Sequence, residues 1–365
     1  GAFLATTADS FDFGNGLQFS ASNPQAAPLL TMSVAPGLQY GANPGNINSS
    51  GNLTVGKDLT LAGGNLDLQG TVTANEEMFL VSSNNITGNA NYSAGDILLF
   101  ADGNITTGGA LRSNVSSGTG NGGNIKLESR TGEINTTAGD IVSGVQENVT
   151  GVAGDVTLLA AGDIRVGDIK ASSNNDEGSN GFSTININST GGSVFLDGSE
   201  LNTTNSGTAV AGGIVLNAQE EISLTSSTVS SNGNFGLIFI GDSFLSDSTS
   251  PQTVTLDAST LSTTNENING TQMSGDISIT AINSISLANA SKMETNTFGS
   301  ANAGSITTNT QNLTVSGGSQ LKSDTSGAGD AGNITISADG IVTFDGVGSE
   351  ASSNEEQFVS TSPDD

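Results

Sequence analysis

Acidic and basic side chains are the first candidates for chemistry in this sequence. The chain holds 36 acidic residues, 8 basic residues and no histidine. A polysaccharide hydrolase works with two carboxylates, and a lyase needs a base, commonly an arginine or a lysine, beside a carboxylate. The densest mixed cluster joins Arg165 and Lys170 to Asp163 and Asp168. The eight basic residues are Lys57, Arg112, Lys126, Arg130, Arg165, Lys170, Lys292 and Lys322.

Catalysis is nevertheless not what these residues favour. The basic residues are scattered along the chain, and the Gly-His-Gly motif of pectin hydrolases is excluded because histidine is absent. We therefore interpret the cluster around Arg165 as a solvated surface with salt bridges. We assign no catalytic residue and expect the protein not to be an enzyme. A polysaccharide-active lyase or hydrolase remains the alternative function.

A ladder of calcium-binding carboxylates is the second candidate. Asp96, Asp155 and Asp276 take equivalent positions in a repeated pattern. The same position is filled elsewhere by Asn124, Ser193, Ser305 and Asn333. A dedicated calcium site requires carboxylates, whereas Asp, Asn and Ser all form hydrogen bonds with the backbone at turns. We expect no metal site and no cofactor, with calcium left open as the one exception.

Aromatic content and charge limit the partners. Carbohydrate-binding surfaces usually carry exposed aromatic platforms, but the chain has no tryptophan and only two tyrosines, Tyr40 and Tyr92. A net charge of −28 repels nucleic acid and anionic membranes, so we expect no nucleic acid as a partner and no membrane insertion. The absence of cysteine excludes disulfides.

The elements that must position these side chains follow from a repeat. Its clearest copy is the stretch 95–111, which places apolar residues at Ile97, Ile105 and Leu111 between polar turns. The first apolar position recurs, mostly at intervals of 20 to 31 residues, as Ile125, Val156, Ile214, Ile277, Ile306 and Ile334. The second recurs as Ile134, Ile164, Ile222, Ile285, Leu313 and Ile341, and the third as Ile169, Leu261 and Leu321.

These units have the periodicity of strands. Short segments alternate with a period of two between turns rich in Gly, Asn, Asp and Ser, and no window has the spacing of a helix. One unit of three short strands cannot bury its apolar side alone, so successive units must stack. The repeat therefore predicts an all-β fold, a parallel β-helix (β-solenoid) of about 12 coils, with aliphatic and Asn/Ser ladders inside.

Three segments are expected along the chain. Residues 1–45 contain four of the six prolines and form an irregular cap or docking segment. Residues 46–347 form the parallel β-helix, and residues 348–365 form an acidic polar tail or linker. Polar excursions at 113–122 and 172–181 are expected to leave the coils as loops. The apolar run 236–240 predicts a strand covered on both faces.

The N-terminal segment resembles a known family. Residues 13–32 read Phe-Gly-Asn-Gly-Leu-Gln-Phe-Ser-Ala-Ser-Asn-Pro-Gln-Ala-Ala-Pro-Leu-Leu-Thr-Met, and residues 34–41 read Val-Ala-Pro-Gly-Leu-Gln-Tyr-Gly. Together with Gly-Asp-Ala-Gly-Asn-Ile-Thr-Ile at 329–336, they resemble large bacterial exoproteins of the filamentous-haemagglutinin type, in particular cyanobacterial-type members.

This resemblance implies a right-handed parallel β-helix, export by two-partner secretion, and a role as a surface adhesin or matrix component. In that family a similar segment lies just after the secretion domain. The secretion domain itself is therefore expected to be absent from this sequence.

We expect an extracellular, secreted or cell-surface rod with a structural or adhesive role. A fibre subunit would join copies end to end, through an interface that includes Phe3, Phe11, Phe13 and Phe19. An adhesin stalk, one section of a longer chain, would instead present the loops 113–122 and 172–181. The expected partners are other copies or the rest of a longer chain, stacked end to end, and cell-surface or matrix polysaccharide.

Overall fold

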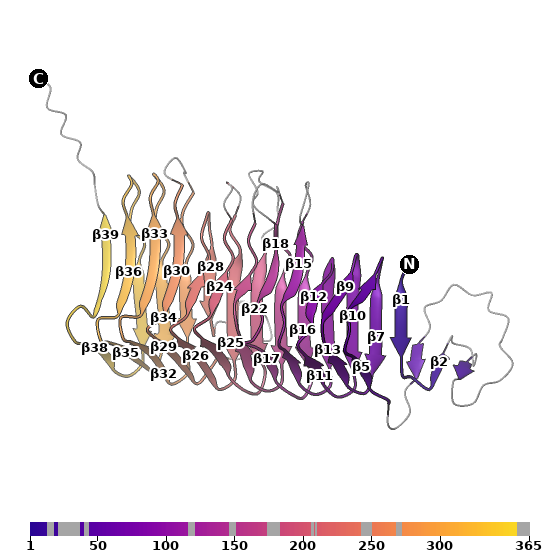
Figure 1. The fold of residues 1–365 in the computed structure, drawn as a ribbon. Helices are drawn as coiled ribbons and strands as arrows, with labels where there is room; N and C mark the ends of the chain where they lie inside the picture. Colours follow the sequence, from indigo (N-terminus) through magenta and orange to yellow (C-terminus); the bar gives the residue numbers. More distant parts are fainter. Residues whose placement is uncertain are drawn as a thin grey trace, which may run out of the picture.

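The chain forms an elongated rod whose strands run across its long axis (Figure 1). The computed structural model describes residues 1–12, 18–20, 37–39, 44–115, 121–145, 151–173, 183–205, 208, 210–241, 250–267 and 272–355. Half of the predicted loop 113–122 and most of the predicted loop 172–181 lie outside these residues. Within the described part of the chain, no helix is present that could cross a membrane.

Three parallel sheets form the walls of the rod, and each contains twelve strands among the described residues. The first sheet consists of β1 (Phe3–Thr6), β7 (Leu59–Gly63), β10 (Glu77–Ser82), β13 (Asp96–Ala101), β16 (Ile125–Ser129), β19 (Val156–Ala160), β22 (Thr184–Ser189), β25 (Gly213–Ala218), β28 (Leu237–Ile240), β31 (Ile277–Thr280), β34 (Ile306–Thr310) and β37 (Ile334–Ala338). The second sheet consists of β5 (Ile47–Ser49), β8 (Leu66–Leu68), β11 (Ile86–Gly88), β14 (Ile105–Thr107), β17 (Ile134–Thr136), β20 (Ile164–Val166), β23 (Val194–Asp197), β26 (Glu221–Thr225), β29 (Thr253–Asp257), β32 (Ser284–Ala288), β35 (Asn312–Ser316) and β38 (Val342–Asp345). The third sheet consists of β6 (Leu53–Val55), β9 (Thr71–Ala74), β12 (Asn91–Ser93), β15 (Leu111–Val115), β18 (Ile141–Val145), β21 (Ile169–Lys170), β24 (Glu200–Asn202), β27 (Thr228–Ser230), β30 (Thr260–Asn265), β33 (Lys292–Thr297), β36 (Gln320–Thr325) and β39 (Glu350–Glu355).

Each coil contributes one strand to each sheet, which confirms the predicted parallel β-solenoid. Equivalent residues of successive coils are paired in register: Ile97 lies between Met78 and Ile125. Inward residues such as Ile125 are buried, whereas the neighbouring Lys126 is partly exposed, and this alternation is the period of two seen in the sequence. The inward side chains form one continuous apolar core along the rod.

The structure contains two coils that the sequence repeat did not predict. Ile185 of β22 and Ile238 of β28 are fully buried and occupy the first apolar position, paired with the neighbours that the repeat predicts. The long intervals from Val156 to Ile214 and from Ile214 to Ile277 therefore each contain two coils. In the last coil, Val342 rather than Ile341 pairs with Leu313.

The sheets extend beyond the expected limits of 46–347. At the N-terminus, β1 pairs in parallel with β7 as the first strand of the first sheet. At the C-terminus, β39 pairs with β36 within the segment expected to be a tail. Ala351 is the only apolar residue of β39, so this strand lacks the apolar alternation that marks the others. Backbone pairing with the preceding coil defines it instead.

A small antiparallel sheet accompanies the irregular N-terminal segment. It consists of β2 (Ser10–Asp12), flanked by β3 (Gln18–Ser20) and β4 (Gly37–Gln39). Figure 1 shows it at the N-terminal end of the rod, beside β1.

The strand covered on both faces is β25, not the predicted run 236–240. All six residues of β25 are buried, including the outward Val215 and Asn217. In β28, which forms most of that run, Ile238 and Ile240 are buried, but Leu237 and Phe239 are only partly buried. The apolar run therefore has one fully covered face.

Buried serines form one of the predicted internal ladders. The backbone N–H of Ser199 donates to Ser227 Oγ, that of Ser227 to Ser259 Oγ, and that of Ser259 to Ser291 Oγ, each at 3.0 Å. The ladder continues from Ser291 N–H to Ser319 Oγ at 3.1 Å. These hydroxyls satisfy N–H groups at a corner where the strand ladder is interrupted.

Candidate functional site

The side chains considered as calcium ligands accept hydrogen bonds from backbone N–H groups of the next coil. Asp96 Oδ1 accepts the N–H of Asn124 at 2.7 Å, and Asn124 Oδ1 accepts the N–H of Asp155 at 2.9 Å. Ser193 belongs to a different ladder, in which its N–H donates to Asp163 Oδ1 at 3.0 Å. Turn stabilisation thus explains the mixture of Asp, Asn and Ser. The described residues contain no group of three or more metal-ligating side chains.

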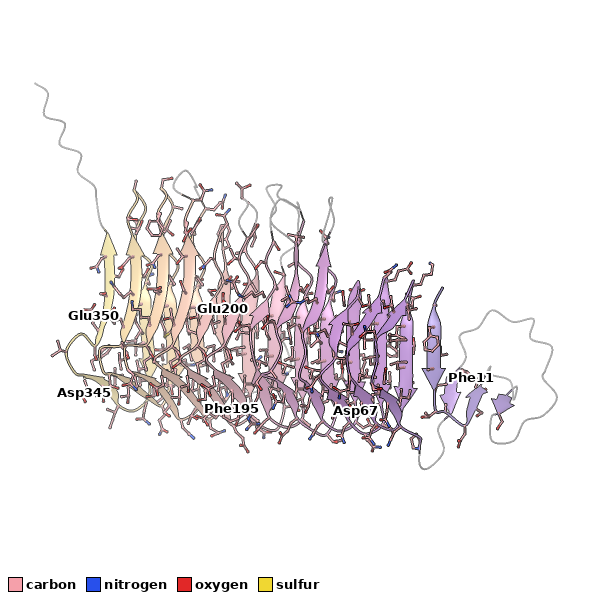
Figure 2. The ribbon with its side chains drawn as sticks, in the orientation of Figure 1. Phe11, Asp67, Phe195, Glu200, Asp345 and Glu350 are labelled. Carbon is pink, nitrogen blue, oxygen red and sulfur yellow. The ribbon has the colours of Figure 1, made fainter. Side chains whose placement is uncertain are left out.

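The candidate catalytic cluster is divided between two sheets. Arg165 lies on β20 in the second sheet, 3.0 Å from Asp163 Oδ2, with its guanidinium 4.6 Å from the centre of the Phe195 ring. Lys170 lies on β21 in the third sheet, and its Nζ is 2.9 Å from Glu200 Oε2. Figure 2 labels Phe195 and Glu200, which mark these two separate pairs.

The charge state of Lys170 also opposes a role as a base. Its hydrogen bond to Glu200 raises the pKa of Lys170, and the same contact lowers the pKa of Glu200. A lyase base must release its proton near neutral pH, which this pairing disfavours. Lys170 and Glu200 are therefore best described as a surface ion pair.

Ion pairing is general for the basic residues. Among the described residues, seven of the eight cations pair with a carboxylate, and the side chains in these pairs are 29% exposed or more. The pairs are Lys57–Glu76, Arg112–Asp140, Lys126–Glu128, Arg130–Asp102, Arg165 with Asp163 and Glu133, Lys170–Glu200, and Lys322–Asp324. Such exposed pairs contribute little stability.

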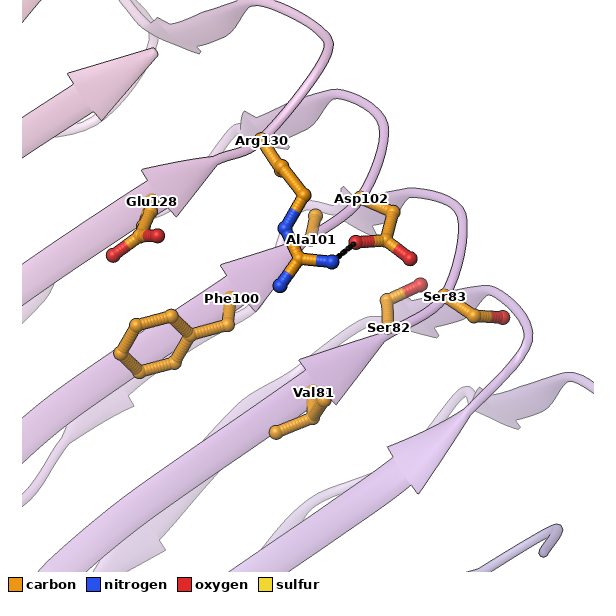
Figure 3. A pocket seen from close by; sticks show the side chains of 8 residues that line it. All are labelled: Val81, Ser82, Ser83, Phe100, Ala101, Asp102, Glu128 and Arg130. Atoms are coloured by element: carbon orange, nitrogen blue, oxygen red, sulfur yellow. Dashed lines mark ion pairs between the residues drawn. The ribbon is translucent and has the colours of Figure 1, made fainter. Parts of the chain in front are cut away.

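A hollow of about 260 Å³ lies at the ends of β10, β13 and β16. Val81, Phe100 and Ala101 supply its apolar lining. Figure 3 shows Arg130 reaching across toward Asp102, and Arg130 Nη1 lies 3.0 Å from Asp102 Oδ1. The remaining lining residues are Ser82, Ser83 and Glu128. The hollow thus combines an apolar floor with a charged rim.

The Phe100 ring belongs to a larger apolar surface. Phe79, Val81, Leu98 and Phe100 point away from the core on the paired strands β10 and β13, and we call them the outer apolar strip. The rings of Phe79 and Phe100 are 5.6 Å apart, and Lys126 Nζ lies 5.2 Å from the centre of the Phe100 ring. The repeat, which is defined by inward positions, does not predict this strip. In the sequence, the strip is indicated by the outward Phe79 and Phe100, each of which lies next to an inward leucine, Leu80 or Leu99.

The phenylalanines proposed as an end-to-end interface lie near the N-terminal end. Phe3 is exposed on β1, opposite Leu59. Phe11 is partly buried on β2, and its backbone is paired with that of Phe19 on β3. Phe13 and the side chain of Phe19 are outside the described residues.

The last coil exposes apolar side chains at the opposite end of the rod. Val342 and Phe344 on β38 are exposed, although their counterparts Leu313 and Val315 in the preceding coil are fully buried. Val347, in the turn after β38, is also exposed. Among the described residues, an apolar cross-section and the last strands of the three sheets therefore face outward here.

Comparison with known families identifies the N-terminal part of this rod. Residues 1–142 match the model of the TPS secretion domain, the domain that defines two-partner secretion. No curated protein and no solved structure matches the chain. The match confirms the resemblance to exoproteins of the filamentous-haemagglutinin type.

The match also corrects one expectation. The secretion domain was expected to be absent, with residues 13–41 lying just after it, but these residues fall inside the matched region. The domain includes the irregular segment and the coils up to β17, so the same solenoid continues through its boundary. No break in the repeat marks the end of the domain, which is why composition did not reveal it.

Proposed function

We propose that this chain, which carries a TPS secretion domain, is a section of an extracellular β-helix rod that is exported by two-partner secretion and has a structural or adhesive role. The match of residues 1–142 is the observation that carries this proposal. The TPS family is not an enzymatic one, and the candidate catalytic residues form exposed ion pairs.

The architecture supports a rod that spans distance. Stacked coils bury one continuous core and leave an acidic surface, with a net charge of −28 for the chain. Such a solenoid gains length by adding coils, without changing the packing of those already present.

We further propose that the outer apolar strip faces the export partner. It lies within residues 1–142, and its four large apolar side chains point outward on two adjacent strands. The outward positions of β22 and β31 carry polar residues such as Asn186 and Ser278, whereas β28 carries Leu237 and Phe239 there. These side chains are partly exposed, and contiguous apolar surface of this kind is typical of protein interaction sites. The adjacent hollow could receive one side chain of the partner.

Export can be tested in the native host with a tagged chromosomal gene. Deletion of residues 1–142 should leave the protein inside the cell envelope. The matched control deletes residues 277–333, which removes two whole coils and joins Asp276 to Ile334, the residue that occupies the same register position as Ile277. This control should reach the medium or the cell surface. Export of the variant without residues 1–142 would contradict the proposal.

A point variant tests the export surface separately. Phe79→Thr with Leu98→Thr removes half of the strip from outward positions, where β-branched polar residues are tolerated in strands. We expect reduced export with an unchanged melting temperature of the purified chain. The control Ser278→Val alters an outward position outside the secretion domain and should not affect export. Normal export of the Phe79/Leu98 variant would place the partner elsewhere.

We also propose that the rods join end to end into fibres, as a specific form of the structural role. The exposed apolar residues at both ends, including Phe3 and Phe344, favour it. Electron microscopy of the purified chain, with and without calcium, should show filaments that are lost in a variant lacking residues 1–45. Short separate rods under every condition would contradict the fibre subunit and leave the stalk of an adhesin.

A further inference from the structure

We propose that a hollow around Phe298 is a binding subsite for neutral polysaccharide. It lies on the third sheet near the C-terminal end, outside the matched secretion domain, and has a volume of about 590 Å³. The proposal deepens the adhesive role proposed above and rests on it for its biological meaning.

An exposed aromatic ring forms the apolar part of this hollow. Phe298 follows β33 directly and is 47% exposed, the highest value for any phenylalanine among the described residues. Its backbone is held in place, because its N–H donates to the carbonyl of Asn265 at 3.1 Å. The exposed ring on this backbone can offer a flat face to the C–H groups of a pyranose. Tyr92 is buried and offers no such face, and Tyr40 is outside the described residues.

A row of amide and carboxylate groups lies beside the ring. Asn296, Asp324 and Asn354 are paired in register on β33, β36 and β39, and all three line the hollow. Asn354 Nδ2 donates to Asp324 Oδ1 at 3.4 Å, which leaves further donors and acceptors of these groups for a ligand. Amides and carboxylates both bind vicinal sugar hydroxyls, as donors, acceptors or both.

Lys322 also lines the hollow, and its Nζ lies 3.2 Å from Asp324 Oδ2. The polar part of the hollow therefore includes two amides, Asn296 and Asn354, and one ion pair.

Charge selects the class of sugar. Lys322, the cation among the described residues that line the hollow, is paired with Asp324, and the chain has a net charge of −28. Anionic polysaccharides are therefore repelled, and neutral pyranoses are favoured. Among the described residues, Asp324 is the only carboxylate that lines the hollow. Hydrolysis of a glycosidic bond usually requires two carboxylates, so the site binds sugar without cleaving it.

Affinity gel electrophoresis of the purified chain tests the proposal. The gels contain dextran, a galactomannan, a β-1,3-glucan or a xyloglucan, with alginate as the anionic comparison. We expect at least one neutral polysaccharide to retard the chain, and Phe298→Ala to weaken this binding about tenfold. The matched control Phe235→Ala removes another exposed phenylalanine and should bind normally.

Several results would overturn the proposal. These are no retardation by any of the four neutral polysaccharides, retardation by alginate alone, or equal binding by Phe298→Ala. If Phe298→Ala does not fold, as judged by its melting curve, the exposed Asn354→Ala replaces it and must weaken binding. The assay is independent of secretion, so a chain that is exported but binds no sugar would refute this subsite alone.

Discussion

Replacement of Ser259 by alanine should destabilise the rod through a single lost acceptor. Ser259 is fully buried, and its Oγ accepts the N–H of Ser227 at 3.0 Å while donating to the carbonyl of Asp257 at 2.9 Å. Alanine fits the same space but leaves the Ser227 N–H without a partner, and Ser227 is 1% exposed. An unsatisfied buried donor costs about 1–3 kcal/mol, so Ser259→Ala should lower the free energy of unfolding by about 2 kcal/mol.

A matched substitution separates this effect from the loss of a hydroxyl as such. Ser349 Oγ accepts the N–H of Gly318 at 3.1 Å, but Ser349 lies at the accessible end of the ladder. Water can replace its hydroxyl, so Ser349→Ala should cost about 0.5 kcal/mol or less. Chemical denaturation gives both values, and amide hydrogen exchange should show the faster exchange confined to the region of Ser227. Equal stability of Ser259→Ala and wild type, or equal costs at both positions, would refute the reasoning.

Three further changes are predicted from the same structure. Tyr92→Phe should raise the melting temperature, with a gain of about 1 kcal/mol, because the buried Tyr92 hydroxyl has no hydrogen-bond partner; a loss of stability in thermal melts would show that the hydroxyl is satisfied. Glu200→Gln should cost at most about 1 kcal/mol at pH 7, since the pair with Lys170 is exposed. Lys170 lowers the pKa of Glu200, so this cost should vanish as the pH falls below 4.5 through the lowered pKa; denaturation curves that show the same cost at pH 3 would contradict the pairing. Gly88→Ala should be far more damaging than Gly198→Ala, since both have positive φ but the new Cβ at residue 88 would overlap the backbone carbonyl of Leu68, whereas residue 198 has open space. Gly198→Ala should cost about 1–2 kcal/mol, and similar melting temperatures for the two variants would argue against this steric account.

The sequence predicted the fold because a solenoid repeats one local rule. Inward residues such as Ile97, Ile134 and Leu261 recur with the register that the paired strands show. The prediction failed for strands that are held in their sheet by backbone pairing alone. Strand β39 has almost no apolar residue, and β1 is separated from its partner β7 by a long stretch of chain, so neither carries a local pattern.

The candidate sites were less accessible to sequence reasoning. Distances along the chain placed Arg165 and Lys170 together, but the corner between β20 and β21 directs them to different sheets. Conversely, Phe79 and Phe100 are 5.6 Å apart only because whole coils stack. The exposed Phe298 is not indicated by the low tyrosine and tryptophan content, which argues against a sugar-binding surface but says nothing of phenylalanine.

Antibody labelling of intact native cells tests the central claim most directly. An antibody raised against the folded chain is applied to intact and to permeabilised cells of wild type and of a strain that lacks the chain. An exported rod should label intact wild-type cells, or appear in their medium, without permeabilisation. Labelling that requires permeabilisation, with none of the protein in the medium, would show that the chain stays inside the cell and would contradict the proposed function.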